Sequence, residues 1–232
     1  MSPLVLLPGL LCDATVWAPQ KEAFTGEFRV TAFRHFYGYN SLNSMAAAVL
    51  DAAPPRFALA GHSMGGRVAL EIMRIAPERV ERLALFDTGA TPASADEPNQ
   101  RRVLIELARK EGMQALAERW LPMLVHPQRL KQIEFMNALI AMICRATPEI
   151  YEAQVQALLT RADYRPVLPR IACPALVASG RDDLWSDVAQ HEEMAAAIPG
   201  ARLELIDDCA HMSTVEVPGA VTKLLRAWMT GS

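Results

Sequence analysis

The sequence has little excess charge and no cluster of basic residues. Its 232 residues include 23 lysines and arginines and 26 aspartates and glutamates, which gives a net charge of −3. Proteins that bind nucleic acid or an anionic membrane surface usually carry a basic face or a basic run. The composition therefore predicts neither a nucleic-acid partner nor a membrane partner.

Paired cysteines are also absent. The four cysteines, Cys12, Cys144, Cys173 and Cys209, are scattered, with no CxxC pair and no spacing typical of a metal site. Scattered thiols are typical of a protein in a reducing compartment. We therefore expect a cytoplasmic protein without a bound metal.

Long hydrophobic runs are missing as well. The longest largely apolar stretch, from Met136 to Cys144, is far shorter than the ~20 residues that span a bilayer. The first residues have no basic region, and their apolar run is too short for a secretory signal. With 51% hydrophobic residues the chain can nevertheless bury a substantial core. We expect a soluble intracellular protein.

The two ends of the chain alternate short apolar runs with helical patterns. Continuous apolar runs without strict alternation are typical of a parallel sheet that is covered on both faces. Strands that alternate with helices form βαβ units, so we predict an α/β fold with a doubly wound, mostly parallel sheet of about six strands. The candidate strands are Pro3–Leu7, Phe28–Phe33, Phe57–Ala60, Leu83–Phe86, Ala175–Ala178 and Arg202–Ile206, and the candidate helices between and after them span 41–53, 64–76, 187–198 and 213–229.

The middle of the chain, residues 91–170, shows no strand pattern. Its apolar spacing predicts about four helices, separated by Gly112, Pro127 and Pro148. A helical block inserted between two strands predicts a lid over the sheet, although a plain structural extension gives the same pattern. The predicted division is a core domain of residues 1–90 and 171–232 with a lid of residues 91–170, whose helices would span 99–111, 113–124, 128–145 and 148–163.

One motif in the first half of the chain indicates a nucleophile. Gly61-His62-Ser63-Met64-Gly65 is a G-x-S-x-G sequence that follows an apolar strand and precedes an amphipathic helix. Such a strand-to-helix turn exposes the serine hydroxyl above the sheet, and side chains at 61 and 65 would collide with neighbouring backbone. The alternative is an ordinary glycine-rich turn or a phosphate loop, but no lysine follows and G-x-G-x-x-G is absent. We predict that Ser63 is the nucleophile.

A serine needs a base, and the base needs an orienting acid. Among the five histidines, His211 lies on the loop between the last strand and the last helix, at the same sheet edge as Ser63. His62 adjoins Ser63, but side chains next to each other at a sharp turn diverge. The acid should come from the loop after Ala175–Ala178, where position alone does not choose. The candidate acids are Asp182, Asp183 and Asp187, and the histidines expected at the solvated surface are His35, His126 and His191.

The loop after the first strand, Leu7 to Trp17, is a candidate for holding an oxyanion. Backbone N–H groups in this loop would complement the N–H of Met64 at the start of the helix after Ser63. A simple β-turn on Pro8-Gly9 is the alternative.

Taken in order, these segments resemble the α/β-hydrolase superfamily over nearly the whole chain. Residues 61–66 are similar to the family's nucleophile elbow, and residues 7–17 to its oxyanion loop, with Pro8 where histidine is common. Residues 180–183 are similar to its Gly-x-x-Asp motif, and residues 209–218 to its Gly-His-x-x-x-x-Glu-x-Pro motif, with Ala210 replacing glycine. The resemblance implies that Asp183 is the acid and that the amide of Leu10 is the second oxyanion donor.

The sequence departs from the family pattern in two loops. Residues 33–41 replace the usual Asp-x-(Arg/Pro)-Gly-x-Gly-x-Ser motif, and residues 184–187 lack the common proline after the acid. The shapes of these two loops are therefore not given by the resemblance.

As a small, lidded serine esterase-like member, the chain would cleave an ester or related acyl bond of a small molecule through an acyl-enzyme on Ser63, without a cofactor, as a monomer or homodimer. The alternatives are a lyase or C–C bond hydrolase with the same triad, and a non-catalytic small-molecule binding module. Residues expected to line the substrate pocket are His62, Leu11, Trp185 and Met212, and arginines that would bind a carboxylate if they faced inward, rather than solvent, are Arg101, Arg102, Arg129 and Arg145.

Overall fold

The computed structural model describes residues 3–231 and contains one six-stranded sheet. Its strand order is β2-β1-β3-β4-β5-β6, and every neighbouring pair is parallel. This sheet confirms the predicted α/β fold. The strands are β1 (Leu4–Leu7), β2 (Val30–Ala32), β3 (Phe57–His62), β4 (Val80–Phe86), β5 (Ala175–Gly180) and β6 (Arg202–Ile206).

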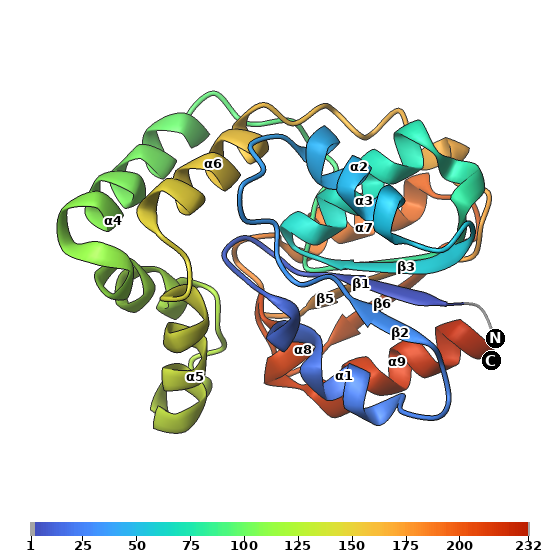
Figure 1. Ribbon diagram of the computed structural model, residues 1–232. Helices are drawn as coiled ribbons and strands as arrows, with labels where there is room; N and C mark the ends of the chain where they lie inside the picture. The colour runs from blue at the N-terminus through green and yellow to red at the C-terminus, as the bar shows by residue number, and fades with distance from the viewer. Residues whose placement is uncertain (1–2, 232) are drawn as a thin grey trace.

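Helices cover both faces of the sheet (Figure 1). Every residue of β1, β3 and β5 is buried, which is why their sequences are continuous apolar runs rather than alternations. The doubly wound arrangement is therefore confirmed. One face carries α2 (Leu42–Ala52), α3 (Met64–Ile75) and α7 (Val188–Ala197), and the other carries α1 (Ala18–Ala23), α8 (Ser213–Glu216) and α9 (Pro218–Thr230).

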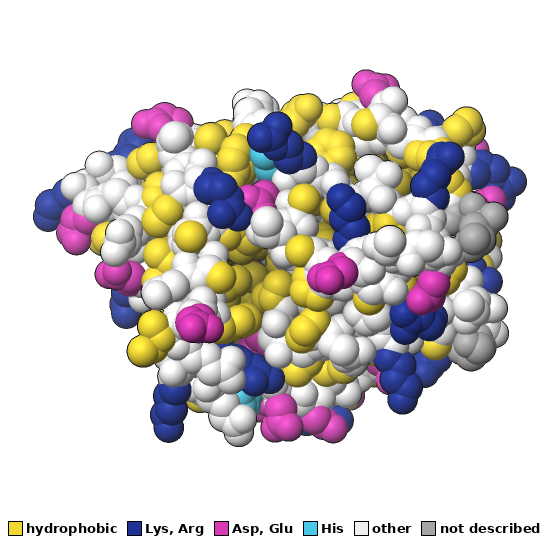
Figure 2. Space-filling model, turned by 60° about the horizontal axis from the view of Figure 1, so that its bottom comes forward, with side chains coloured by type: hydrophobic (Ala, Val, Ile, Leu, Met, Phe, Trp, Pro, Cys, Tyr) yellow, Lys and Arg dark blue, Asp and Glu magenta, His cyan; other side chains and the backbone are white. Residues whose placement is uncertain are grey.

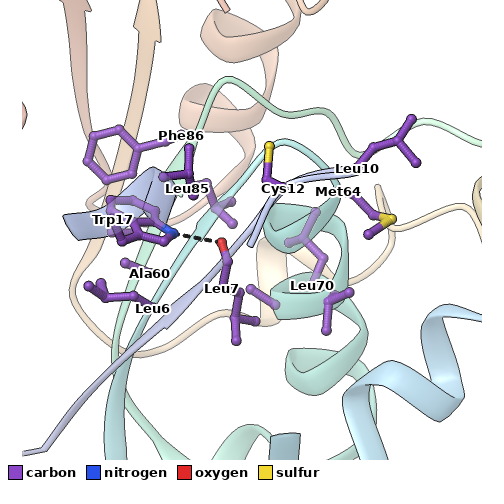
Figure 3. Close-up of a cluster of buried hydrophobic side chains, with 14 of the residues drawn as sticks. Leu6, Leu7, Leu10, Cys12, Trp17, Ala60, Met64, Leu70, Leu85 and Phe86 are labelled. Carbon is purple, nitrogen blue, oxygen red and sulfur yellow. Dashed lines mark hydrogen bonds between the residues drawn. The ribbon is translucent and has the colours of Figure 1, made fainter. Parts of the chain in front are cut away.

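The loop after β1 is anchored in the core by Trp17 (Figure 3). Its indole Nε1–H donates to the carbonyl oxygen of Leu7 at 2.9 Å, and its ring meets that of Phe86 edge-on at 5.8 Å. The Trp17 side chain is fully buried, so its polar N–H needs this partner. The hydrogen bond ties the far end of the loop back to the strand from which it leaves.

Between β4 and β5 the chain leaves the sheet and forms the helical segment, residues 91–170, whose helices lie at the left of Figure 1. Its helices are α4 (Glu97–Trp120), α5 (Ile133–Ile143) and α6 (Pro148–Leu159). The first two predicted helices are joined end to end as α4, whose helical backbone breaks at Gly112, where φ is 88° and ψ is 174°. The third is shorter than predicted, because a separate turn at Arg129–Lys131 precedes α5.

The predicted helix 213–229 is two helices instead of one. Val217 is the residue between α8 and α9, and its φ of −133° is not helical. Proline disfavours helical geometry at the residue before it, so Pro218 ends α8 and begins α9. None of the helices within residues 3–231 is long and apolar enough to cross a membrane.

Candidate active site

Ser63 lies at the turn from β3 to α3 in a strained backbone conformation. Its φ is 53° and its ψ is −118°, a region that residues with side chains rarely adopt. The turn is tight because its glycines touch backbone directly. A Cβ on Gly61 would lie 2.3 Å from the carbonyl oxygen of Gly65, and one on Gly65 would lie 2.4 Å from that of Leu7. Only glycine fits at both positions, as the sequence motif predicts.

Three loops bring Ser63, His211 and Asp183 into one hydrogen-bonded chain. The Ser63 hydroxyl donates to Nε2 of His211 at 2.8 Å, and Nδ1–H of His211 donates to Oδ2 of Asp183 at 2.8 Å. The other Asp183 oxygen accepts the backbone N–H groups of Trp185 at 2.8 Å and Ser186 at 2.9 Å. Both carboxylate oxygens of Asp183 therefore have partners, which fix the orientation of the carboxylate and of the imidazole ring.

The other two aspartates of this loop have different partners. The Asp182 side chain is 50% exposed and lies 3.6 Å from Nε2 of His126. Asp187 is the N-cap of α7, where its carboxylate accepts the N–H of Gln190 at 3.0 Å. Of the three aspartates that sequence position left open, Asp183 is therefore the one that hydrogen-bonds to His211.

The charges within the hydrogen-bonded chain of Ser63, His211 and Asp183 make His211 a stronger base. Burial opposes protonation of His211, but the adjacent Asp183 carboxylate outweighs it, and the pKa of His211 is raised above 6.5. Burial alone would raise the pKa of Asp183, yet His211 and the N–H groups of Ser186 and Trp185 lower it below 3.8. An ionised Asp183 is therefore paired with an imidazole that takes up a proton readily.

A buried carboxyl group that we did not predict, Asp87, lies beside this chain. Its oxygens accept the N–H of Gly180 at 3.0 Å, the N–H of Ser213 at 3.3 Å and the Ser213 hydroxyl. Burial and the charge of Asp183 raise the pKa of Asp87 to about 8, so it carries a proton at neutral pH. Its sequence signal is its place directly after the strand Leu83–Phe86, at the carboxyl edge of the sheet.

Two histidines besides His211 are buried near the site. Nε2–H of His62 donates to the carbonyl oxygen of His211 at 2.7 Å, and burial followed by the charge of His211 lowers the pKa of His62 to about 3. His62 is therefore neutral and supports the backbone of His211. The prediction that His191 lies at the surface is wrong, because the ring is buried and its Nε2 accepts the N–H of Thr88 at 3.0 Å.

Two cavities open beside Ser63. A tight one of about 10 Å³ is lined by His62, Met212, Leu10 and other, mostly apolar residues. A larger one of about 650 Å³ is lined by Met64, Trp185, Leu10 and a mixture of polar and apolar residues. Figure 2 shows a hollow lined by hydrophobic side chains between the helical segment, at the left, and the rest of the molecule. Leu10 and Met64, whose amides were predicted to hold an oxyanion, thus line cavities together with Ser63.

Leu11 lines neither cavity, although we expected it in the substrate pocket. Its φ of 58° turns the chain, and its side chain is fully buried in the core. Its backbone N–H donates to Oε1 of Gln154, on α6, at 2.9 Å. A fully buried side chain is a core residue, so Leu11 shapes the loop rather than the pocket.

The two cysteines near Ser63 are poorly suited to be nucleophiles. Burial and the neighbouring Asp13 raise the pKa of Cys12 to about 12, and burial also raises that of Cys209. A thiol reacts as its thiolate, so both groups are inert at neutral pH. Within residues 3–231, no group of three His, Cys, Asp or Glu side chains is arranged to hold a metal ion.

Known proteins resemble this chain over nearly its whole length. A family model described as the Alpha/beta hydrolase family matches residues 4–224. The pimeloyl-[acyl-carrier protein] methyl ester esterase of Nitrosomonas europaea is 27% identical, over 93% of this chain and 90% of that protein. A thermophilic esterase from Thermogutta terrifontis, solved with malate bound, is 31% identical with a TM-score of 0.90, over 100% of this chain and 90% of its own. The enol-lactonase from Burkholderia xenovorans LB400 is 30% identical with a TM-score of 0.89, over 99% of this chain and 92% of its own.

The chain belongs to the alpha/beta hydrolase family, because the family model spans nearly its whole length. The resemblance seen in its motifs is thereby confirmed. These three matches are named as two esterases and an enol-lactonase, and the protein is an enzyme of the hydrolase class.

Proposed function

We propose that the protein is a serine hydrolase that cleaves a carboxylic ester, or a related acyl bond, of a small molecule through an acyl-enzyme on Ser63. The observation that carries this proposal is the continuous chain from Ser63 through His211 to Asp183, with both hydrogen bonds at 2.8 Å, beside a cavity of about 650 Å³. Relatives named as esterases and an enol-lactonase support the same chemistry.

In the first step the hydroxyl oxygen of Ser63 attacks the carbonyl carbon of the ester. The hydroxyl proton passes to Nε2 of His211, and the Asp183 carboxylate stabilises the imidazolium that forms. The N–H groups of Leu10 and Met64 hold the negative oxygen of the tetrahedral intermediate. When the bond to the leaving alcohol breaks, His211 gives its proton to the alcohol oxygen, and the acyl group stays on Ser63.

In the second step water attacks the acyl-enzyme. His211 takes a proton from this water and returns it to the oxygen of Ser63 as the acyl bond breaks. The products are one carboxylic acid and one alcohol for each ester and each water consumed. A neutral His211 starts both steps, so its state of protonation controls the rate.

We also propose that the helical segment, residues 91–170, is a lid on a core domain of residues 1–90 and 171–232. Trp120, Leu121 and Leu124 of this segment line the tight cavity beside Ser63. The backbone N–H of His211 donates to the carbonyl oxygen of Leu124 at 3.0 Å. These contacts support a role for the segment in keeping water away from the reacting groups.

A cytoplasmic location is part of the proposal, and it is supported by the four free cysteines of the structure. Assembly as a monomer or homodimer remains a prediction, which sedimentation equilibrium would test.

Labelling with a fluorophosphonate, followed by peptide mapping, tests the nucleophile directly. The label should be found on Ser63 in the wild type and in the control variant His35→Gln, because His35 does not contact the triad. It should be absent in Ser63→Ala and strongly reduced in His211→Ala. On a reactive ester, Ser63→Ala should lower kcat by about 10⁴-fold.

The same experiment separates the alternatives. A folded wild-type protein that is not labelled and hydrolyses no ester would contradict the proposal. If Ser63 is labelled but only C–C cleavage or elimination substrates are turned over, the triad serves a lyase or C–C bond hydrolase. Binding without any turnover would leave the binding-module alternative.

A further inference from the structure

The larger cavity beside Ser63 has an excess of positive charge. Its lining includes four arginines but a single carboxylate, that of Glu97. An apolar substrate would gain nothing from cationic groups in the wall of its pocket. The four arginines are Arg67, Arg101, Arg119 and Arg161.

Contacts within the protein account for the position of one of these arginines, Arg161. Nη2 of Arg161 pairs with Glu97 at 2.7 Å. Its remaining donors reach the backbone carbonyl oxygens of Thr91, Pro92 and Leu158. All the donor nitrogens of Arg161 are therefore used within the protein, and Glu97 is largely neutralised by this one partner.

Arg67, in contrast, makes no ion pair within residues 3–231. It follows Ser63 by one turn of α3, and Nη1 donates to the carbonyl oxygen of Thr91 at 2.9 Å. Burial and the like charge of Arg161 lower its pKa to about 9. The guanidinium is still charged at neutral pH, but no carboxylate of the described residues lies within ion-pair distance of it.

Arg101 shares the same surroundings. Its guanidinium lies 5.1 Å from the ring centre of Trp185, and Nη2 meets Glu97 at 3.2 Å. The side chain is only 7% exposed, and its Nη1 has no hydrogen-bond partner among the described residues. Arg101 and Arg161 thus share the carboxylate of Glu97 and Arg67 pairs with none, so these three guanidinium groups carry two positive charges more than this carboxylate balances.

Uncompensated charge inside a protein is costly, because water that would solvate it has been displaced. A ligand that supplies the missing negative charge recovers this cost on binding. Since Arg67 and Arg101 line the same cavity as Ser63, such a ligand would lie next to the nucleophile.

We propose that Arg67 and Arg101 bind a carboxylate of the substrate, so that the enzyme acts on short esters or lactones that carry a free carboxylate. This inference rests on the proposed function, since it names the substrate class for the same site. Both arginines line the cavity that Ser63 also lines, so the carboxylate lies in the same cavity as the carbonyl that Ser63 attacks. Half-esters of small dicarboxylic acids are the simplest members of this class.

A matched pair of substrates isolates the charge. Monomethyl glutarate and its neutral amide counterpart, methyl 4-carbamoylbutanoate, differ only in carboxylate against carboxamide, and the succinate and adipate pairs vary the spacing. Acid release at constant ionic strength should give the wild type at least a tenfold higher kcat/KM on the charged member of one pair. Arg67→Gln and Arg101→Gln should each reduce that preference about 10- to 100-fold.

Arg102→Gln is the matched control. Arg102 neighbours Arg101 on α4, but its side chain is 68% exposed and does not line the cavity. This variant should keep the wild-type preference. Arg67→Lys tests whether the charge rather than the fold is responsible, because it keeps the charge without the planar fork and should give an intermediate preference.

A second measurement does not depend on the choice of ester. Free glutarate should slow the labelling of Ser63 by a neutral fluorophosphonate in the wild type, and much less in Arg67→Gln. Equal protection by inorganic phosphate at the same ionic strength would overturn the assignment to a carboxylate.

The two proposals fail in different ways. If Ser63 is labelled but the charged and neutral esters react equally for every spacing, the carboxylate site is refuted and the serine hydrolase stands. If the folded wild type is neither labelled nor active on any ester, the proposed function is refuted, and the substrate class with it.

Discussion

One methyl group added at two equivalent helix positions should have opposite effects on stability. Gly65 and Gly219 are the second residues of α3 and α9. A Cβ on Gly65 would lie 2.4 Å from the carbonyl oxygen of Leu7 and 2.7 Å from that of Pro8, whereas a Cβ on Gly219 would have nothing within 4 Å. Overpacking typically costs 1–3 kcal/mol, and because backbone atoms cannot turn aside, we expect Gly65→Ala to lose about 3 kcal/mol.

The control substitution should be mildly stabilising. Alanine at a compatible position restricts the unfolded chain and adds about 0.4–1 kcal/mol, so Gly219→Ala should be more stable than the wild type. In a chain of this size one kcal/mol shifts Tm by about 2–4 °C, so Gly65→Ala should melt about 6–12 °C lower and Gly219→Ala about 1–4 °C higher.

Thermal unfolding and the rate of fluorophosphonate labelling would measure both effects. Relief of the clash at Gly65 moves the Leu7–Pro8 backbone, and with it the loop that carries Leu10, so labelling of Ser63 in Gly65→Ala should slow at least tenfold. Gly219→Ala should label at the wild-type rate. Equal Tm shifts for the two variants, or full labelling in Gly65→Ala, would refute the assigned packing of the turn.

Two further predictions concern titratable groups. The kcat/KM of ester hydrolysis should rise with pH through the raised pKa of His211, because only the neutral imidazole accepts the Ser63 proton, and a pH profile that falls over this range would contradict its role as base. Asp87, with a folded-state pKa of about 8 against 3.8 unfolded, contributes stability that is present below about pH 4 and lost as the pH rises through 8. Between pH 5 and 8, the loss of unfolding free energy should therefore be smaller in Asp87→Asn than in the wild type by at least ~2 kcal/mol. Urea unfolding at a series of pH values measures this loss, and an equal loss in the two proteins would contradict the prediction.

The sheet could be predicted because burial on both faces leaves a direct record in the sequence. The strands were found wherever apolar residues are continuous, but β4 begins at Val80 rather than Leu83. Glu81 and Arg82 are half-buried at the start of this strand, so their charges interrupted the pattern without ending the strand. The break of the last helix at Val217 was missed, although Pro218 was there to indicate it.

The candidate site residues could be predicted where they lie within a short sequence motif. Ser63 lies in a glycine-flanked turn, and His211 in a loop between a strand and a helix. Asp87 was missed because its role depends on Gly180 and Ser213, which are 93 and 126 residues away along the chain. Arg67 had only a weak signal, its spacing of one helical turn from Ser63. That no carboxylate of the described residues lies within ion-pair distance of this guanidinium depends on side chains packed around it in space, which no local pattern records.

The hydrogen bond between His211 and the helical segment limits how that segment can change. The backbone of His211 is held by the carbonyl oxygen of Leu124, and the backbone N–H of His126 donates to Oε2 of Glu216 at 2.7 Å. A side-chain substitution at one position of the segment leaves these two backbone contacts in place. A chimera that imports the whole segment from a relative, or an insertion between residues 121 and 126, would instead remove a support of the imidazole. New specificity in this enzyme should therefore be sought by point substitution rather than by exchange of the segment.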